Sequence, residues 1–322
     1  MNILSVMPFE QRHRDLLERT GTGCSFIWAS IPTVTMEQVE QADIILGNVP
    51  PAMLKNAGRL QWLQLNSAGA DAYCAPGILP QEVLLTCSTG AYGISVSEWM
   101  VTASLMLCRK MDLYMRNQLS HRWHDEGRVT SVWNSTTLVV GLGDIGGEYA
   151  KRMKALGSYV IGVRRRPSDT LPDYLDELHT TEELDMLLPR ADFVALILPG
   201  TPQTDRLMNA QRLALMKPGA FLLNAGRGNS VDAEALVRAL ESGALGGAAL
   251  DVVPGPEPLD SSSPLWDAPR CMICPHIAGK FNLPETFERI TAITDHNLRA
   301  YLQGNRGGMR NIVDRSTGYR TR

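Results

Sequence analysis

Several features that define large protein classes are missing from this chain of 322 residues. No apolar run reaches the roughly 18 residues that a membrane-spanning helix needs, so no transmembrane segment is expected. The N-terminus, Met1 to Val6, contains neither a basic start nor a long apolar stretch, and we expect no secretory signal there. The formal net charge is only -3, which gives no general attraction to nucleic acid or to an anionic membrane.

Cysteines are few and scattered, and they form no repeated metal-binding pattern. Their positions within apolar stretches are typical of reduced thiols in a cytoplasmic protein rather than of a disulfide framework. The segment Cys271 to His276 brings two cysteines and a histidine together, but a structural zinc site usually needs a second such pair, and none exists. We therefore expect no metal site and a cytoplasmic location. The cysteines are Cys24, Cys74, Cys87, Cys108, Cys271 and Cys274.

The length and composition indicate a globular protein with more than one domain. Hydrophobic cores stop growing at roughly 250–300 residues, so a chain of 322 residues is expected to form two domains. The hydrophobic content of 44% and the charged content of 20% are close to the globular average. Short apolar runs alternate with amphipathic stretches almost throughout, which is typical of parallel βαβ units and therefore of an α/β fold.

The apolar periodicity predicts two successive sets of strands. Proline-rich residues 254–258 must form a loop, because proline excludes helix and inner strand. Thr180 and Glu183 resemble a capping box at a helix start. Helices are predicted at 9–19, 93–118, 148–156 and 284–302. Strands are predicted at 3–6, 25–29, 43–46, 60–65 and 83–86, and then at 137–140, 159–163, 193–198, 221–223, 248–252 and 272–274.

A glycine-rich turn follows the first strand of the second set. The chain there reads Gly141-Leu142-Gly143-Asp144-Ile145-Gly146, a G-x-G-x-x-G motif between a strand and a helix. In a dinucleotide site Gly141 would make the tight turn, Gly143 would let the backbone approach the pyrophosphate, and Gly146 would let the helix pack closely. Asp144 and Ile145, between the second and third glycines, are also expected to bind the cofactor, and the N-terminus of the following helix would face the phosphates. The alternative is a tight βα turn that binds no ligand.

The end of the next strand bears on the choice of cofactor. NAD-binding units usually have an acidic residue there for the ribose 2′-OH, whereas this chain has Arg164, followed by Arg165 and Arg166. Guanidinium groups suit a 2′-phosphate, which they can hold by charge-assisted, forked hydrogen bonds. We therefore expect NADP(H) to be preferred, with NAD(H) possible. The alternative is that the three arginines form a solvated basic loop that binds no cofactor.

Three further segments follow the glycine motif in a specific order. Together with the motif they resemble the D-isomer-specific 2-hydroxyacid dehydrogenase family from about Leu60 to the end of the chain. The ending Val313-Asp314-Arg315, with Gly318-Tyr319, resembles the glyoxylate/hydroxypyruvate reductase branch. The three segments are Leu223 to Gly228, Leu250 to Val253 with Glu257-Pro258-Leu259, and Pro275 to Gly279.

The resemblance implies a catalytic set of three residues. Arg227 matches the arginine that binds the substrate carboxylate and polarises the 2-oxo group. His276 matches the acid/base that gives a proton to the carbonyl oxygen, and Glu257 matches the carboxylate that orients this imidazole. The family usually has five residues from the preceding Asp251 to that glutamate, but this chain has six. We prefer Glu257 because Glu257-Pro258-Leu259 keeps the local pattern, and the distance from Glu257 to His276 becomes the open question.

The resemblance implies further binding residues. Asp251 resembles the residue that holds the nicotinamide carboxamide, and Pro199, Thr204 and Ala225 are expected in the cofactor site. In the first domain, the loop from Asn66 to Asp71 resembles the family's substrate loop, where the backbone N–H groups of Ala68 and Gly69 would bind the substrate carboxylate. The alternative for that loop is an ordinary turn at a strand end.

The expected architecture is α/β, with two Rossmann-like doubly wound parallel-sheet domains and an interdomain cleft. In the family, residues 1–97 and 284–322 would form a flavodoxin-like substrate-binding domain and residues 98–283 the NAD(P)-binding domain. The resemblance implies a homodimer that reduces glyoxylate, hydroxypyruvate or similar 2-oxo acids to D-2-hydroxy acids. Two other readings stay open, a dinucleotide-sensing binding protein like the family's corepressors and a relative that acts on formate or phosphite.

Overall fold

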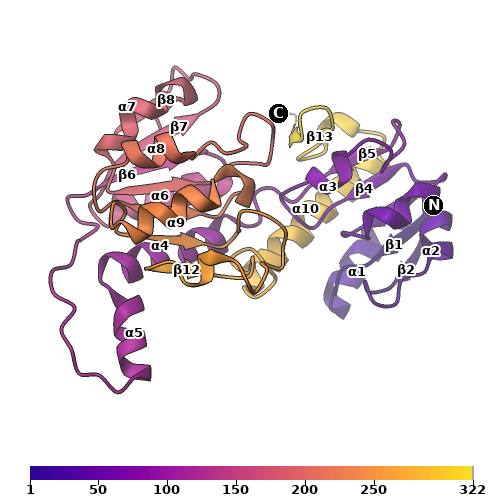
Figure 1. Ribbon diagram of the computed structural model, residues 1–322. Coiled ribbons are helices and arrows are strands. Elements are labelled where there is room, and N and C mark those ends of the chain that lie inside the picture. Colours follow the sequence, from indigo (N-terminus) through magenta and orange to yellow (C-terminus); the bar gives the residue numbers. More distant parts are fainter. Residues whose placement is uncertain (321–322) are drawn as a thin grey trace. The chain divides into compact units, whose positions relative to one another are not determined.

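The computed structural model describes residues 1–320 and divides into two compact units. Unit 1 is discontinuous, consisting of Met1–Tyr92 and Phe281–Arg322, and unit 2 is Gly93–Lys280. The sequence predicted domain boundaries at 97/98 and 283/284, and each lies a few residues after the corresponding boundary between the two units. Figure 1 shows the two units in colours that follow the sequence, and both the indigo N-terminal segment and the yellow segment from α10 to β14 belong to unit 1.

Unit 1 is built on a parallel sheet of five strands in the order β2-β1-β3-β4-β5. This order is that of flavodoxin-like doubly wound folds. The middle strands are almost entirely buried, which explains why they read as continuous apolar runs in the sequence. The strands are β1 (Asn2–Ser5), β2 (Ser25–Trp28), β3 (Ile44–Leu46), β4 (Trp62–Gln64) and β5 (Leu84–Thr86), and the helices between them are α1 (Gln11–Thr20), α2 (Met36–Gln41), η1 (Pro51–Asn56) and α3 (Asp71–Cys74).

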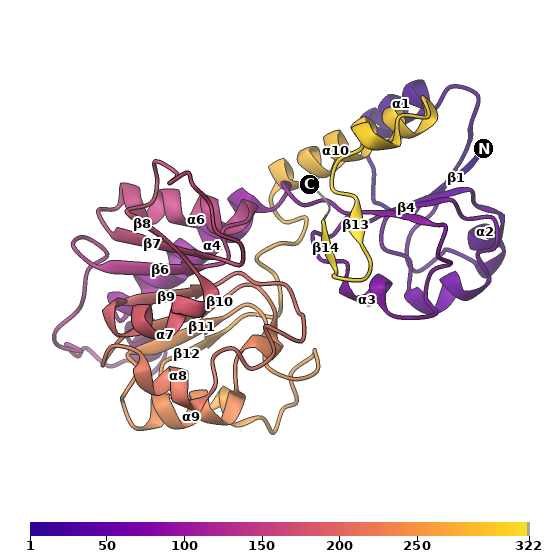
Figure 2. The same ribbon diagram turned by 90° about the horizontal axis from the view of Figure 1, so that it is seen from above.

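The end of the chain completes unit 1. Helix α10 (Pro284–Leu302) coincides with the helix predicted at 284–302 and begins with proline, which favours a first turn. It packs against α1 and buries Ile290, Asn297 and Leu298 completely. The short helix η6 (Arg306–Gly308) and an antiparallel hairpin of β13 (Val313–Asp314) and β14 (Tyr319–Arg320), visible in Figure 2, follow it.

Unit 2 is built on a parallel sheet of seven strands in the order β12-β11-β10-β9-β6-β7-β8. The chain starts in the middle at β6, runs outward to β8, and returns to continue from β9 to β12. This reversal is the Rossmann-type order, and ligands of such sheets bind at the carboxyl ends of the strands where the order reverses. The strands are β6 (Thr136–Val140), β7 (Tyr159–Arg164), β8 (Glu177–Thr180), β9 (Phe193–Leu196), β10 (Phe221–Asn224), β11 (Gly247–Leu250) and β12 (Cys271–Ile273).

Helices pack on the seven-stranded sheet. Helix α4 packs against α6 and against β10 and β11, and α8 packs against α9 (Figure 1). No helix within residues 1–320 is both long enough and apolar enough to cross a bilayer. The helices are α4 (Gly93–Cys108), α5 (Met111–Leu119), α6 (Asp144–Ala155), η2 (Thr181–Glu183), α7 (Leu184–Leu187), η3 (Leu188–Arg190), α8 (Ala210–Leu215), η4 (Gly228–Ser230), α9 (Ala233–Glu241) and η5 (Pro264–Trp266).

Two sequence-based helix assignments in unit 2 were wrong, and one strand was missed. The long helix predicted at 93–118 is two helices, because Lys110 adopts a left-handed conformation with φ 57° and the chain turns there between α4 and α5. Helix α6 begins at Asp144 rather than near residue 148, because Gly143 is its N-terminal capping residue. Strand β8 was missed, since its four residues lie at the sheet edge and are only half-buried, so they carry no apolar run.

Candidate active site in unit 2

The predicted catalytic and cofactor residues of unit 2 follow the carboxyl ends of its strands. Because parallel strands end at one edge of a sheet, six separate segments of the chain are brought to the same edge. The glycine motif follows β6, Arg164 ends β7, and Pro199 follows β9. Further along the chain, Ala225 and Arg227 follow β10, Asp251 and Glu257 follow β11, and His276 follows β12.

The three glycines of the motif have different surroundings. Gly141 has φ 105°, and an added Cβ would lie 2.2 Å from the carbonyl oxygen of Ile197. A Cβ on Gly146 would lie 1.9 Å from the carbonyl oxygen of Gly141, so the helix can approach the turn only without a side chain there. A Cβ on Gly143 would meet no protein atom within 4 Å. The fold therefore requires Gly141 and Gly146, whereas Gly143 faces open space at the N-terminus of α6, which fits an approaching phosphate.

Replacing Gly143 with alanine therefore separates stability from binding. Its φ of -81° suits alanine, so we expect an unchanged melting temperature. NADPH should bind about tenfold more weakly or worse, which corresponds to about 1.4 kcal/mol, because the methyl group would occupy the open space predicted to receive the phosphate. The measurements are calorimetric titration and thermal unfolding. Gly146→Ala is the matched control and should lower the melting temperature; equal NADPH affinity of Gly143→Ala and the wild type would contradict the phosphate site.

Arg164 is the exposed last residue of β7, and Arg165 and Arg166 are also exposed. Arg164 pairs in register with Thr180, the last residue of the edge strand β8. The backbone N–H of Thr180 donates to the Glu183 carboxylate at 2.9 Å, which forms the predicted capping box and fixes this end of β8. The backbone at the cationic end of β7 is thus paired with a neighbouring strand end that is itself fixed by a hydrogen bond.

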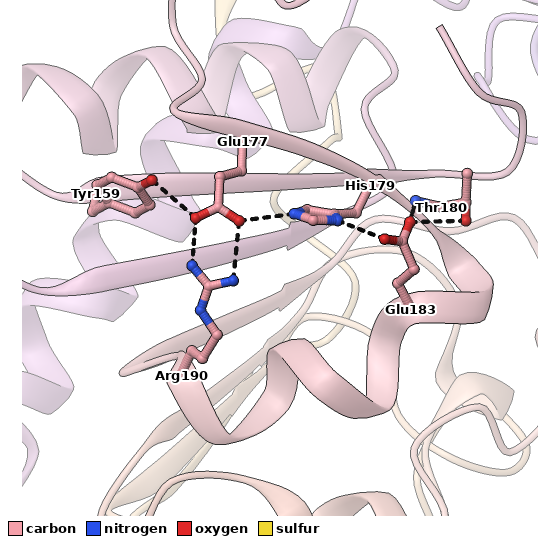
Figure 3. A network of polar contacts seen from close by, with 6 residues as sticks. All are labelled: Tyr159, Glu177, His179, Thr180, Glu183 and Arg190. Carbon is pink, nitrogen blue, oxygen red and sulfur yellow. Dashed lines mark hydrogen bonds and ion pairs between the residues drawn. The ribbon is translucent and has the colours of Figure 1, made fainter.

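A polar network also holds the edge strand β8 (Figure 3). The two ring nitrogens of His179 contact Glu183 at 2.9 Å and Glu177 at 2.8 Å, and both can donate only in the protonated ring. Arg190 forms a forked ion pair with Glu177 and holds the pKa of this carboxyl near 2. Tyr159 donates to the same carboxylate at 2.9 Å. Sequence reasoning missed this network. Its signals were that Glu177 and His179, two residues apart on a strand, lie on the same face, and that Glu183 belongs to the recognised capping box.

The network predicts a pH-dependent contribution to the stability of unit 2. The hydrogen bond to Glu183, followed by that to Glu177, raises the pKa of His179 above 6.5. Stability from a raised pKa is complete below the unfolded value and is lost as the pH rises through the folded value. The lowered pKa values of Glu177 and Glu183 act oppositely, and their contribution is complete above 4.5. All three contributions therefore coincide between pH 4.5 and 6.5.

We expect the melting temperature of His179→Gln to fall below that of the wild type by a few degrees in this window. The difference should shrink as the pH rises through the raised pKa of His179, since the native ring then loses its second donor. Thermal unfolding across pH 5 to 9 measures it. His296→Gln is the control, because His296 contacts a backbone carbonyl and no carboxylate within residues 1–320. A difference that is constant with pH would contradict the linkage.

Arg227 lies on a turn that is fixed from several sides. The buried amide of Asn224 donates to the Arg227 carbonyl at 3.0 Å and accepts from the Gly226 N–H at 3.1 Å, and the Ser230 hydroxyl donates to the same carbonyl at 2.7 Å. A Cβ on Gly228 would lie 1.6 Å from the Val253 carbonyl oxygen. The half-buried guanidinium donates through Nη1 to the Gly226 carbonyl at 2.8 Å. The turn thus holds a cation at the strand edge in one backbone conformation.

The loop after β9 has a structural hydroxyl. Thr204 is buried and donates from Oγ1 to the Pro199 carbonyl at 2.7 Å, while it accepts from the Thr201 N–H at 2.9 Å. Thr204 therefore shapes the loop that carries Pro199. Ala225 is half-buried, and its N–H donates to the Leu196 carbonyl of β9 at 3.1 Å.

The structure brings His276 and Glu257 together. Nδ1 of His276 lies 2.8 Å from Oε2 of Glu257, although 19 residues separate them and the loop has one more residue than the family pattern. Because the carboxylate accepts only, the Nδ1–H donates and the Nε2 atom is left for another partner. The two side chains are about half exposed, at 49% and 41%, so Nε2 can meet a ligand from solvent.

Asp251 fixes the backbone next to the histidine. Its buried carboxylate accepts from the N–H groups of Ile277 at 2.9 Å and Ala278 at 3.1 Å, and its carbonyl accepts from the His276 N–H at 2.9 Å. These contacts hold His276 at φ 52°, in the left-handed region. Burial raises the pKa of Asp251, and the two backbone hydrogen bonds oppose this shift. Within residues 1–320 the residue thus positions the histidine segment, a role that sequence reasoning missed.

The predicted substrate loop belongs to unit 1 and follows β4. Asn48 and Asn66 hold the loop, because the side-chain oxygen of each accepts from the backbone N–H of the other at 2.8 and 2.9 Å. The Ser67 hydroxyl donates to the Gly69 carbonyl at 2.6 Å. Within the described residues the N–H groups of Ala68 and Gly69 donate no hydrogen bond. The loop can therefore offer both donors to an anion.

The cysteines of the segment Cys271 to His276, which were considered as metal ligands in the sequence analysis, have other roles in the structure. Cys271 lies buried on β12, and burial raises its pKa to about 12. Cys274 accepts from the indole Nε1–H of Trp99 at 3.4 Å. The two thiols thus serve packing and a weak hydrogen bond.

Comparison with known proteins gives consistent matches. Residues 101–278, more than half of the chain, match the model of the family described as "D-isomer specific 2-hydroxyacid dehydrogenase, NAD binding domain". The chain is similar to glyoxylate/hydroxypyruvate reductase A of Serratia proteamaculans, with 32% identity over 73% of this chain and 76% of that protein.

Solved structures resemble nearly the whole chain. A D-isomer specific 2-hydroxyacid dehydrogenase family protein from Aeromonas salmonicida has 28% identity and a TM-score of 0.85, with 98% of this chain and 99% of that one covered. A NADPH-dependent glyoxylate/hydroxypyruvate reductase from Sinorhizobium meliloti, in complex with NADP and sulfate, has 26% identity and a TM-score of 0.82 over 99% of both chains. The fold class predicted from the sequence, with two parallel-sheet α/β domains, is confirmed. The chain belongs to the D-isomer-specific 2-hydroxyacid dehydrogenase family.

Proposed function

We propose that the protein reduces small 2-oxo acids, such as glyoxylate or hydroxypyruvate, to D-2-hydroxy acids with NADPH as the preferred cofactor. The observation that carries the proposal is the hydrogen bond between His276 and Glu257 at the sheet edge that also presents Arg227 and the glycine motif. An acid/base, an orienting carboxylate, a fixed guanidinium and a phosphate loop are the groups that this reduction requires.

Each residue has a defined task in this proposal. The Arg227 guanidinium binds the substrate carboxylate and stabilises negative charge that develops on the carbonyl oxygen. The N–H groups of Ala68 and Gly69 in unit 1 are two further donors for a substrate carboxylate. His276 delivers a proton from Nε2 to the carbonyl oxygen, while Glu257 keeps Nδ1–H pointing toward itself and stabilises the charged ring. The dinucleotide, when bound, supplies a hydride to the carbonyl carbon.

The preference for NADP rests on the end of β7. Arg164 stands where an acidic residue would hold a ribose 2′-OH, and Arg165 and Arg166 follow it. The related reductase from Sinorhizobium meliloti is itself described as NADPH-dependent. Forked hydrogen bonds from guanidinium groups suit a 2′-phosphate.

The test is the absorbance of the nicotinamide band during incubation with a panel of 2-oxo acids and either NADPH or NADH. Oxidation of NADPH by glyoxylate or hydroxypyruvate, faster than oxidation of NADH, is expected. Tight NADPH binding without oxidation by any 2-oxo acid would contradict the reductase and favour a sensor, while turnover restricted to a larger or sulfonated acid would correct the substrate. Turnover of a sulfonated acid has a precedent in a related (S)-sulfolactate dehydrogenase of Chromohalobacter salexigens.

Replacing Arg164 with aspartate should reverse the cofactor preference. The carboxylate repels the 2′-phosphate and accepts from a ribose 2′-OH, so kcat/KM for NADPH relative to NADH should fall by roughly 10- to 100-fold, as expected for the loss of one or more charge-assisted hydrogen bonds. Steady-state kinetics with both cofactors measure this ratio. Arg238→Asp on α9 makes the same charge change away from the strand end and should leave the ratio unaltered. An unchanged ratio in Arg164→Asp would refute the 2′-phosphate role.

We extend the proposal to a cytoplasmic homodimer that associates through unit 2. Support comes from apolar side chains left exposed on α5 and the segment after it, among them Leu119 at 84% and Trp123 at 106% exposure. Such side chains in one region are typical of an interface. Sedimentation of the wild type and of Trp123→Ser would show whether the dimer exists and uses this segment.

A further inference from the structure

A concave surface is lined entirely by residues of unit 1, and we name it the three-arginine pocket. Its volume is about 780 Å³, within the range of about 300–1,000 Å³ that small-molecule sites occupy. Three segments far apart in the sequence line it, namely the connection after β5 at Thr89 and Gly90, helix α10, and the end of the chain. Ile293 and Met309 add apolar contacts.

Positive charge dominates this pocket. Arg289, Arg310 and Arg320 all line it. Arg289 uses its Nε for an ion pair with Glu285 at 2.9 Å, which leaves the two terminal nitrogens of its fork for another partner. Arg320 donates to the amide oxygen of Asn311 at 3.4 Å, and the exposed Arg310 side chain has no ion pair within residues 1–320. Among residues 1–320, the three guanidinium groups therefore have one carboxylate partner, Glu285, and the pocket has room for an anion.

The backbone that carries these cations is fixed before any ligand arrives. The amide of Asn297, which is fully buried on α10, accepts from the Arg310 N–H at 2.7 Å and donates to its carbonyl at 3.0 Å. Asn311, at φ 57°, donates from its side chain to the Thr89 carbonyl at 2.7 Å. Because the segment 310–311 is tied to both α10 and the segment after β5, little ordering of its backbone is needed when a ligand binds.

The same segment after β5 leads to the predicted substrate loop. The N–H of Ser88 donates to the Ser67 carbonyl at 2.9 Å, and the Tyr92 hydroxyl donates to the Asn66 carbonyl at 2.5 Å. Residues 88–92 thus contact the substrate loop, and Thr89 and Gly90 among them line the three-arginine pocket. A ligand in the pocket can therefore affect the loop that holds Ala68 and Gly69.

We propose that the three-arginine pocket binds an oxyanion, namely a phosphate, sulfonate or carboxylate group, as a site additional to the groups that bind the 2-oxo acid and the dinucleotide. Guanidinium forks match the geometry of phosphate, sulfonate and carboxylate oxygens. The anion has two conceivable sources, a free ion that acts as an effector or a second acidic group carried by a substrate. The binding of the anion does not depend on the proposed reductase activity, whereas its effect on catalysis does.

The first experiment is calorimetric titration of the full-length protein with inorganic phosphate at constant ionic strength. We expect saturable binding in the wild type and an affinity lower by about tenfold or more in Arg310→Ala and Arg289→Ala, the effect of losing one charge-assisted hydrogen bond. Arg310→Lys should give an intermediate value, since lysine keeps the charge and loses the fork. Arg19→Ala removes an exposed cation of unit 1 outside the pocket and should bind like the wild type.

Two variants separate this pocket from the other arginine sites. Binding that is lost in Arg310→Ala but kept in Arg164→Asp and in Arg227→Ala supports the proposal. Absence of saturable binding in the wild type, or equal affinity in Arg310→Ala, would overturn it. Circular dichroism and the melting temperature confirm that each variant is folded. Since no turnover is measured, failure of the reductase proposal does not affect this result.

Kinetics distinguish the two sources of the anion. For a free effector, phosphate should change the KM for glyoxylate in the wild type and leave that of Arg310→Ala unaltered. For a substrate-borne group, Arg310→Ala should raise the KM for 2-oxo dicarboxylic acids about tenfold while the KM for glyoxylate stays the same, and phosphate should compete with the dicarboxylic acid. If phosphate binds but neither KM effect is observed, the pocket binds an anion without influence on turnover. That result would overturn the link between the pocket and the substrate loop.

Discussion

Arg227→Ala is expected to lower kcat/KM for the 2-oxo acid by roughly 10²- to 10³-fold, the usual loss when one donor to a developing oxyanion is removed. The carboxylate of the substrate would lose its forked partner, and the carbonyl oxygen would lose a positive charge that the turn at Gly226 to Gly228 holds in place. NADPH affinity should stay nearly unchanged, because the glycine motif and Arg164 belong to other segments. Steady-state kinetics and calorimetric titration with NADPH measure the two quantities separately.

Arg227→Lys is the matched control for this prediction. Lysine keeps the charge but presents no planar fork, so we expect activity between that of the wild type and that of Arg227→Ala. Rates of Arg227→Ala equal to the wild type at saturating substrate would remove this residue from the catalytic set. A lysine variant as inactive as the alanine variant would show that the fork, rather than the charge, is required.

His276→Gln is expected to lower kcat by about 10²- to 10⁴-fold, the range of general acid catalysis. Glutamine preserves approximate size and one hydrogen bond to Glu257, but it cannot deliver a proton from the position of Nε2. The pH dependence should change as well, since the limb of the rate profile that reports the acid should vanish. Steady-state rates across pH 5 to 10 with saturating cofactor and substrate provide the measurement.

Glu257→Gln tests whether the carboxylate acts through the histidine. Alone it should slow the reaction less than His276→Gln does, because the amide can still orient the ring while its charge is gone. The double variant should be no slower than His276→Gln, since residues that act as one unit have non-additive effects. A double variant whose loss equals the product of the two single losses would place Glu257 outside the pair.

The elements that the sequence predicted well are those with a strong local signal. Strand β6 carries a continuous apolar run into a glycine motif, and helix α10 begins at a proline and keeps an apolar stripe, so both could be located. The capping box at Thr180 and Glu183 is equally local. The break at Lys110 could not be foreseen, because an apolar stripe resumes after it and a left-handed lysine has no sequence signal.

The site required tertiary information at two points. The hydrogen bond between Glu257 and His276 spans two strand ends and an enlarged loop, and its geometry cannot be computed from spacing. The supporting groups Asn224 and Asp251 act through backbone atoms, so their partners are set by the path of the chain and not by residue type. The family resemblance predicts the residues that would face a ligand, and the structure adds the groups that hold their backbone.

The discontinuous make-up of unit 1 has a consequence for synthesis on the ribosome. Chains fold from the N-terminus as they emerge, and unit 2, being continuous, can complete its sheet while the last segment is still being made. Until the last segment is made, the first 92 residues lack helix α10, which packs on α1 and places the Phe287 ring against the His13 ring. A chain truncated before Pro284 would therefore contain a complete nucleotide-binding domain joined to an incomplete unit 1. The apolar surface left exposed on unit 1 would make this chain a substrate for chaperones and proteases.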